Sequence, residues 1–150
     1  GTPHYETFRY AMEHSKNPLC YNGDLVSVDG YVNLLTDWEK EQACDRAKVT
    51  SVMVGRGVLK DPALIEKLAA YASGEAYGTD AKKKLPAFHD RLGADYGKEF
   101  SGDQNVLFKL KELWSCLIVR FPGKEKEAKA IRKAKRLEEY QAAVRRVFSE

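Results

Sequence analysis

The chain has 150 residues and a net charge of +3, and 43% of its residues are hydrophobic and 31% charged. This balance is that of an ordinary globular protein, so disordered and collagen-like classes are excluded. No stretch reaches the roughly 20 apolar residues that cross a bilayer, and the first residues show no secretion-signal pattern. We therefore expect a cytoplasmic protein without a membrane segment, folded as one domain of usual size or two small ones.

Charge is distributed unevenly along the chain. Residues 1–72 contain 8 Lys and Arg against 10 Asp and Glu, whereas residues 73–150 contain 17 against 12. The segment 120–148 alone has 10 basic and 4 acidic residues. This asymmetry indicates two modules with different partners, which we place at 1–72 and 73–150.

The cysteines are odd in number and far apart, at Cys20, Cys44 and Cys116. Their spacing argues against a disulfide framework and against a CxxC metal site. Free thiols buried in a reducing compartment are the simplest interpretation. The three histidines also lack metal-ligand spacing, and we interpret them as surface or packing residues.

The first half of the chain alternates between helical and strand-like patterns. Apolar residues at helical spacing predict helices over 5–14, 28–41 and 61–71. Short apolar or β-branched runs predict strands over 19–21 and 49–54. Ser27 and Asp61 are suited to cap the second and third helices. Strands that alternate with helices form parallel sheets, and because two parallel strands are not stable alone, we expect these two to belong to a larger sheet.

From residue 80 onward the sequence shows only helical periods. They predict helices over 80–97, 104–120, 124–132 and 136–148. The second of these has a broad apolar stripe, which is typical of the central helix of a bundle. We therefore expect an all-α helical bundle in this half.

A turn containing glycine follows each predicted strand. The turns are Asn22-Gly23-Asp24 and Gly55-Arg56-Gly57. Glycine lets the backbone approach a ligand and point successive N–H groups at an anion, and a guanidinium suits phosphate. In (β/α)8 barrels the loops after the last two strands are a common phosphate site. The alternative is that each is an ordinary polar turn, with a solvated arginine in the second.

The two turns and their strands together resemble a known family. NPLCYNGDL (residues 17–25) and SVMVGRGVLKDP (residues 51–62) are similar to the last two barrel strands of the tRNA-dihydrouridine synthases. Residues 108–122 and the basic segment beyond them resemble, less specifically, the C-terminal helical domain of that family. The resemblance implies that 1–72 is an α/β fragment of a TIM (β/α)8 barrel and that 73–150 is an all-α helical bundle that binds tRNA.

The family uses FMN, with NADPH as the usual reductant, to reduce uridine to 5,6-dihydrouridine in tRNA. The resemblance implies an FMN phosphate pocket lined by Asn22, Gly23, Asp24, Gly55 and Arg56. It also implies that the catalytic cysteine of the family, and the lysine and histidine that help to hold FMN, lie on barrel segments absent from this chain. We therefore expect this fragment alone to be catalytically inactive and to self-associate through its incomplete barrel edge.

The basic segment has two interpretations. It is a solvated helical surface, or it contacts the phosphate backbone of folded RNA. The second interpretation assigns RNA contacts to Arg120, Lys124, Lys129, Arg132, Lys133 and Arg136. Two other functions stay open for the whole chain. One is a non-catalytic RNA-binding module whose helical half is the functional unit, and the other is a different phosphate-binding barrel enzyme.

Overall fold

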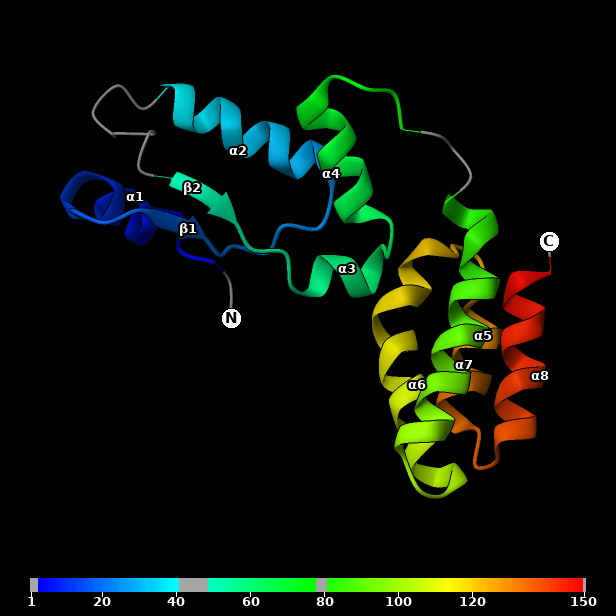
Figure 1. Ribbon diagram of the computed structural model, residues 1–150. Coiled ribbons are helices and arrows are strands. Elements are labelled where there is room, and N and C mark those ends of the chain that lie inside the picture. The colour runs from blue at the N-terminus through cyan, green and yellow to red at the C-terminus, as the bar shows by residue number, and fades with distance from the viewer. Residues whose placement is uncertain (1–2, 41–48, 78–80, 150) are drawn as a thin grey trace. The chain divides into compact units, whose positions relative to one another are not determined.

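The computed structural model describes residues 3–40, 49–77 and 81–149 (Figure 1). The chain divides into two compact units, Gly1–Tyr77 and Gly78–Glu150. Each unit has a hydrophobic cluster of its own. None of the described helices combines the length and the apolar character needed to cross a lipid bilayer.

The first unit is built on two short strands. The strands are β1 (Leu19–Tyr21) and β2 (Val49–Val52). They lie side by side and parallel, with Leu19 opposite Val49 and Tyr21 opposite Val52 (Figure 1). This pairing confirms the parallel arrangement that the alternating pattern predicts. Among the described residues each strand has only the other as a partner, so each has one unpaired edge.

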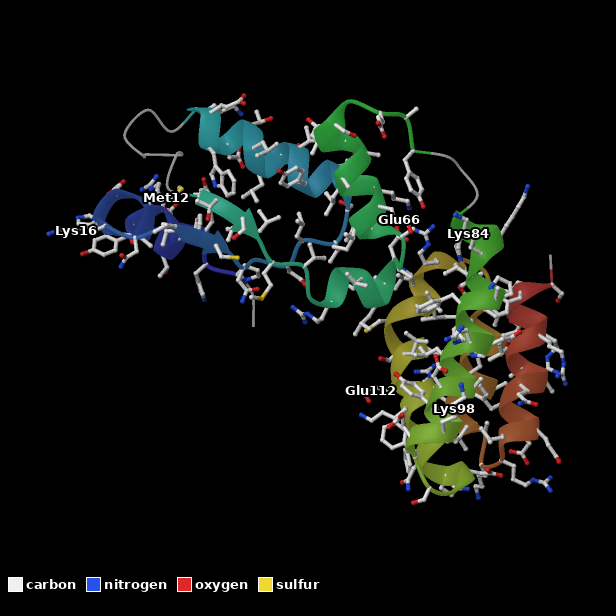
Figure 2. All side chains as sticks on the ribbon, viewed as in Figure 1. Met12, Lys16, Glu66, Lys84, Lys98 and Glu112 are labelled. Carbon is white, nitrogen blue, oxygen red and sulfur yellow. The ribbon has the colours of Figure 1, made fainter. Side chains whose placement is uncertain are left out.

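One face of this sheet is covered by two helices. They are α1 (Tyr5–His14) and α2 (Val28–Lys40). Met12 of α1, labelled in Figure 2, and Trp38 of α2 are buried in one cluster, and both strands pack against it. The Phe8 ring joins them, because its centroid lies 4.9 Å from that of Tyr21 and 6.1 Å from that of Trp38. The Ser27 hydroxyl accepts a hydrogen bond from the Gly30 N–H at 3.0 Å, as expected of a helix cap.

The other face of the sheet is exposed. Cys20 pairs with Ser51 across the strands, and both residues are exposed. The prediction of buried thiols is therefore wrong for Cys20, whose side chain alternates away from the covered face. Cys116 is half-buried, and Cys44 lies outside the described residues, as does the predicted helix end at 41.

Two helices follow β2. They are α3 (Arg56–Lys60) and α4 (Leu64–Ser73). The sequence does not predict α3, which takes in two residues of the expected glycine turn and ends where the Asp61 N–H bonds to the Gly57 carbonyl at 2.8 Å. The helix predicted from residue 61 begins later, because the Asp61 carboxylate accepts a hydrogen bond from the Ala63 N–H and holds a turn there instead.

The described part of the second unit is a helical bundle. Its helices are α5 (Ala81–Glu99), α6 (Asp103–Leu117), α7 (Glu125–Lys133) and α8 (Leu137–Phe148), with a 3-10 turn, η2 (Ile118–Arg120), after α6. These helices match the predicted ranges within a few residues, although residue 80 lies outside the described part.

The helix α6 is the centre of this bundle, as its apolar stripe predicts. Six of its residues are buried in one cluster with side chains from the other three helices. They are Val106, Leu107, Leu110, Leu113, Trp114 and Leu117. Tyr140 of α8 is completely buried in the same cluster, and Phe148 packs against it, so both are core residues.

Candidate functional site

The two glycine turns meet at one end of the sheet. Because β1 and β2 are parallel neighbours, their carboxyl ends lie at the same end. The Met53 N–H donates to the Tyr21 carbonyl at 2.8 Å, so the strands stay together as they enter the turns. Beyond this point Arg56 Nη2 lies 3.2 Å from Asp24 Oδ2. This ion pair joins the turn after β1 to the segment after β2.

Glycine is required in both segments because the backbone is crowded there. A Cβ atom on Gly57 would collide with the Leu25 carbonyl oxygen and press on the Leu64 side chain. A Cβ on Gly23 would collide with the Tyr21 ring. Both glycines are buried. At Gly57 the segment after β2 therefore approaches the Leu25 carbonyl more closely than a residue with a side chain would allow, whereas at Gly23 the Tyr21 ring of the same segment fills the space.

The carboxyl end of the sheet offers hydrogen-bond donors to an anion. The N–H groups of Gly23, Asp24, Gly55 and Arg56 donate to no described residue. The Arg56 side chain is 60% exposed and that of Asp24 is 35% exposed. An exposed ion pair is weak, and a guanidinium has five N–H donors, so Arg56 retains donors for a ligand. The Asp24 carboxylate opposes an anion, whereas exposed Asn22 adds a neutral polar group.

A basic face lies on α7 in the second unit. Lys126, Lys129, Arg132 and Lys133 are all exposed, and their spacing of three or four residues makes them neighbours on the helix surface. No described carboxylate lies within ion-pair distance of any of the four. Neighbouring like charges repel, so this face is suited to a polyanion.

The other predicted RNA contacts are differently placed. The Lys124 ammonium donates to the carbonyls of Arg146 at 3.0 Å and Ser149 at 2.9 Å, and so satisfies the C-terminal end of α8. The Arg136 guanidinium pairs with Glu139 at 3.2 Å. Arg120 is half-buried in η2. Of the six residues predicted to bind RNA, the structure therefore brings together Lys129, Arg132 and Lys133 on one exposed face. Lys126 is an addition that helical spacing could have supplied.

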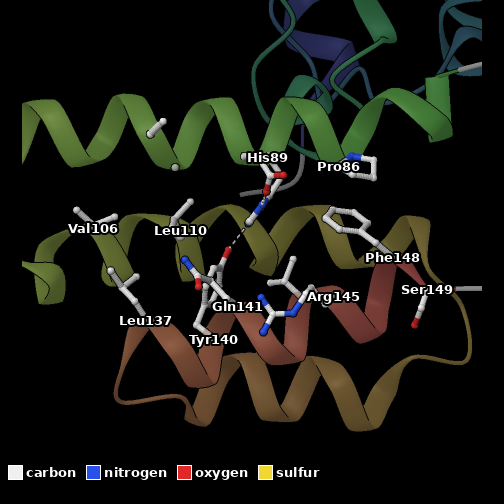
Figure 3. Close-up of a pocket in the computed structure, with 14 residues that line it drawn as sticks. Pro86, His89, Val106, Leu110, Leu137, Tyr140, Gln141, Arg145, Phe148 and Ser149 are labelled. Carbon is white, nitrogen blue, oxygen red and sulfur yellow. Dashed lines mark hydrogen bonds and ion pairs between the residues drawn. The ribbon is translucent and has the colours of Figure 1, made fainter.

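A second feature of the bundle is a cavity of about 860 Å³ lined by α5, α6 and α8 (Figure 3). Leu110 and Phe148 are among its apolar walls, and Gln141 and Arg145 are among its polar residues. His89 points from α5 across the cavity, and its Nε2 lies 2.6 Å from the Tyr140 hydroxyl oxygen (Figure 3). This hydrogen bond links α5 to α8.

Burial controls the titration of this pair. Desolvation lowers the pKa of His89 below its usual value, and the nearby Asp90 carboxylate, 3.3 Å from Nδ1, opposes the shift. Desolvation raises the pKa of Tyr140 well above its usual value. With neutral His89, the Tyr140 hydroxyl donates to Nε2 and Nδ1–H donates to Asp90. Both groups are thus held uncharged, and His89 is a packing residue as predicted.

The described residues contain no group of three His, Cys, Asp or Glu side chains that could hold a metal ion. Comparison with protein-family models and with curated proteins gave no match.

Replacing Gly57 with Ala should destabilise the first unit. The added Cβ meets a backbone carbonyl, which cannot move aside without displacing the turn, so we expect a loss of about 1–3 kcal/mol. Chemical unfolding followed through Trp38 fluorescence measures it. Gly55→Ala is the matched control, because a Cβ there meets nothing within 4 Å. Equal stability of the two variants would contradict the close approach.

The second unit should lose stability as the pH falls below the unperturbed histidine value of about 6.5. The folded-state pKa of His89 is depressed, so the unfolded chain binds the proton more readily, and stability present above that pH is lost on acidification. Unfolding followed through the Trp114 indole signal between about pH 8 and 5 tests this. His89→Gln should flatten the dependence, whereas exposed His14→Gln should leave it intact. A wild-type dependence in both variants would exclude His89 as its source.

Proposed function

We propose that this chain is the C-terminal part of an FMN-dependent tRNA-dihydrouridine synthase. Residues 1–72 contribute part of the barrel wall and the FMN phosphate pocket, and the helical unit contributes tRNA contacts. The observation that carries the proposal is the contact between Asp24 and Arg56. It brings together, at the carboxyl end of the sheet, the two turns on which the family resemblance depends.

The arrangement of the first unit supports a barrel wall. The strands β1 and β2 are consecutive along the chain and adjacent in the sheet, and α1 and α2 cover the same face. In (β/α)8 barrels consecutive strands are neighbours, the helices form an outer ring, and the other face lines the interior. On this proposal the unpaired edges of β1 and β2 meet further barrel strands. In the isolated chain they provide the self-association surface.

Part of the FMN site can be assigned to residues of this chain. The N–H groups of Gly23, Gly55 and Arg56 would donate to the phosphate, and the Arg56 guanidinium would add a charged donor. Asp24 would hold the guanidinium in place at some cost in affinity for the anion. When bound, FMN reduced by NADPH supplies the hydride for the uridine ring. The resemblance places the acid that completes the reduction outside this chain, so the chain alone is expected to be inactive.

Arg56→Gln should weaken FMN binding to the full chain, whereas Asp24→Asn should strengthen it, because these changes remove an attractive and a repulsive charge beside the phosphate. Amide NMR shifts of Gly23, Gly55 and Arg56 during FMN titration provide the measurement. Lys60→Gln, which removes an equal charge at the other end of α3, is the control.

The same titration separates the alternatives. If FMN at saturation leaves the turn amides unshifted, the flavin assignment is wrong. If inorganic phosphate shifts them as effectively as FMN does, a different phosphate-binding barrel enzyme is favoured.

The basic face should give tRNA binding that depends steeply on salt, because each phosphate contact releases counterions. Replacing Lys129 or Lys133 with Gln should lower the slope of log affinity against log salt by about one for each charge removed. Filter binding of an unmodified tRNA transcript measures the slope. Lys98→Gln is the control, because the Lys98 ammonium already pairs with Asp95 at 3.0 Å. Equal slopes in all variants would exclude α7 as the contact surface.

A non-catalytic RNA-binding module is the second candidate function. The observation that favours it is that the basic α7 face belongs to a unit with its own buried core. Salt-dependent tRNA binding without FMN-induced shifts at the glycine turns would favour this candidate over the flavoenzyme.

A further inference from the structure

The helix α6 exposes one large aromatic side chain. Phe108 is 68% exposed, more than any other large hydrophobic residue in the described part of the chain. Its neighbours along α6 include six buried residues, so the helix is otherwise well packed. An exposed ring contributes little to folding, because it forfeits the free energy of burial.

Phe108 borders a small hollow between α6 and the turn that joins α7 to α8. The hollow is about 330 Å³, and it is lined by Gln104, Leu107, Phe108, Lys111, Ala134 and Lys135. Two hydrogen bonds fix its opposite wall. Gln104 Nε2 donates to the Lys135 carbonyl at 2.8 Å, and Lys111 Nζ donates to the Ala134 carbonyl at 2.9 Å. The hollow is therefore preorganised, and its size is at the lower end of the range of about 300–1,000 Å³ for ligand sites.

Cations lie at this hollow and beside it along the chain. Lys135 lines the hollow and is exposed, and Lys133, two residues earlier, is also exposed. No described carboxylate pairs with either ammonium group, although the Glu139 carboxylate accepts a hydrogen bond from the Lys135 backbone N–H at 2.9 Å. The nearest acidic residue along α6, Glu112, points away from the bundle (Figure 2) and pairs with Lys109 at 3.1 Å. A flat aromatic ring beside unpaired cations is the combination by which proteins bind single-stranded nucleic acid.

We propose that this hollow binds one unpaired nucleobase of RNA, stacked on Phe108, with the flanking phosphates at Lys133 and Lys135. The inference rests on the proposed function, because it requires that the helical unit binds RNA. Folded RNAs present such bases in loops and bulges, where proteins stack them on aromatic side chains. Phe108 adds a stacking contact to the phosphate contacts of α7.

A protein partner is less well suited to this surface. A docked helix needs several apolar anchors spaced three or four residues apart. On α6 the residues four and seven positions after Phe108 are Glu112 and Ser115, both exposed and polar. This surface therefore offers a docked helix one aromatic ring among polar and basic side chains, and not a row of apolar contacts.

The test compares Phe108→Ala with wild type in the full chain, using an unmodified tRNA transcript. We expect about a tenfold loss of affinity, as for the loss of one base–aromatic stack. The slope of log affinity against log salt should be unchanged, because no charge is removed. Phe108→Trp should retain wild-type affinity. Phe88→Ala on α5, where the ring is 39% exposed, is the matched control and should have no effect.

A second measurement detects stacking directly. A hairpin RNA with 2-aminopurine in its loop should lose fluorescence on binding wild type and retain it with Phe108→Ala. With 2-aminopurine in the stem, neither protein should change the signal. The inference is overturned if Phe108→Ala binds tRNA as wild type does, or if it instead abolishes association with a second protein. Failure of wild type itself to bind tRNA overturns the proposed tRNA-binding function as well.

Discussion

The parallel pairing of β1 with β2 is the constraint on which the candidate anion site depends. Antiparallel strands would send the two glycine turns to opposite ends of the sheet, and parallel strands send them to the same end. Once the turns share one end of the sheet, the absence of a side chain at Gly57 lets its backbone come close to the Leu25 carbonyl, and the Asp24 carboxylate reaches the Arg56 guanidinium. The N–H groups of both turns that donate to no described residue are thereby gathered at this end of the sheet.

Some of this structure could be predicted because the responsible signal is local. The helix α1 and the stripe on α6 follow directly from apolar spacing. The two strands follow from short apolar runs that end in turn residues. Even the parallel direction follows from the alternation of elements, since a strand, a helix and a strand in succession leave little other choice.

Other features escaped prediction because they depend on contacts distant in the sequence or on segments too short to have a period. The helix α3 has five residues, which is barely more than one turn, so no apolar spacing marks it. Lys124 belongs by composition to the basic segment, yet its ammonium is bound to the end of α8 some twenty residues later. The sequence predicts that the two turns are neighbours, but it does not predict that Asp24 pairs with Arg56, because no local pattern indicates which side chains of two turns meet. The charge of the sequence therefore predicts that the second half is basic, but it does not predict which partner each Lys or Arg side chain binds.

The two units keep separate buried clusters, one centred on Trp38 and the other on α6. Free-energy effects of substitutions at sites that share no partners are close to additive. A substitution in the cluster beneath the sheet and a substitution in the bundle should therefore change the free energy of unfolding independently of each other. Substitutions on the surface of the bundle can therefore accumulate without changing how side chains pack around the glycine turns.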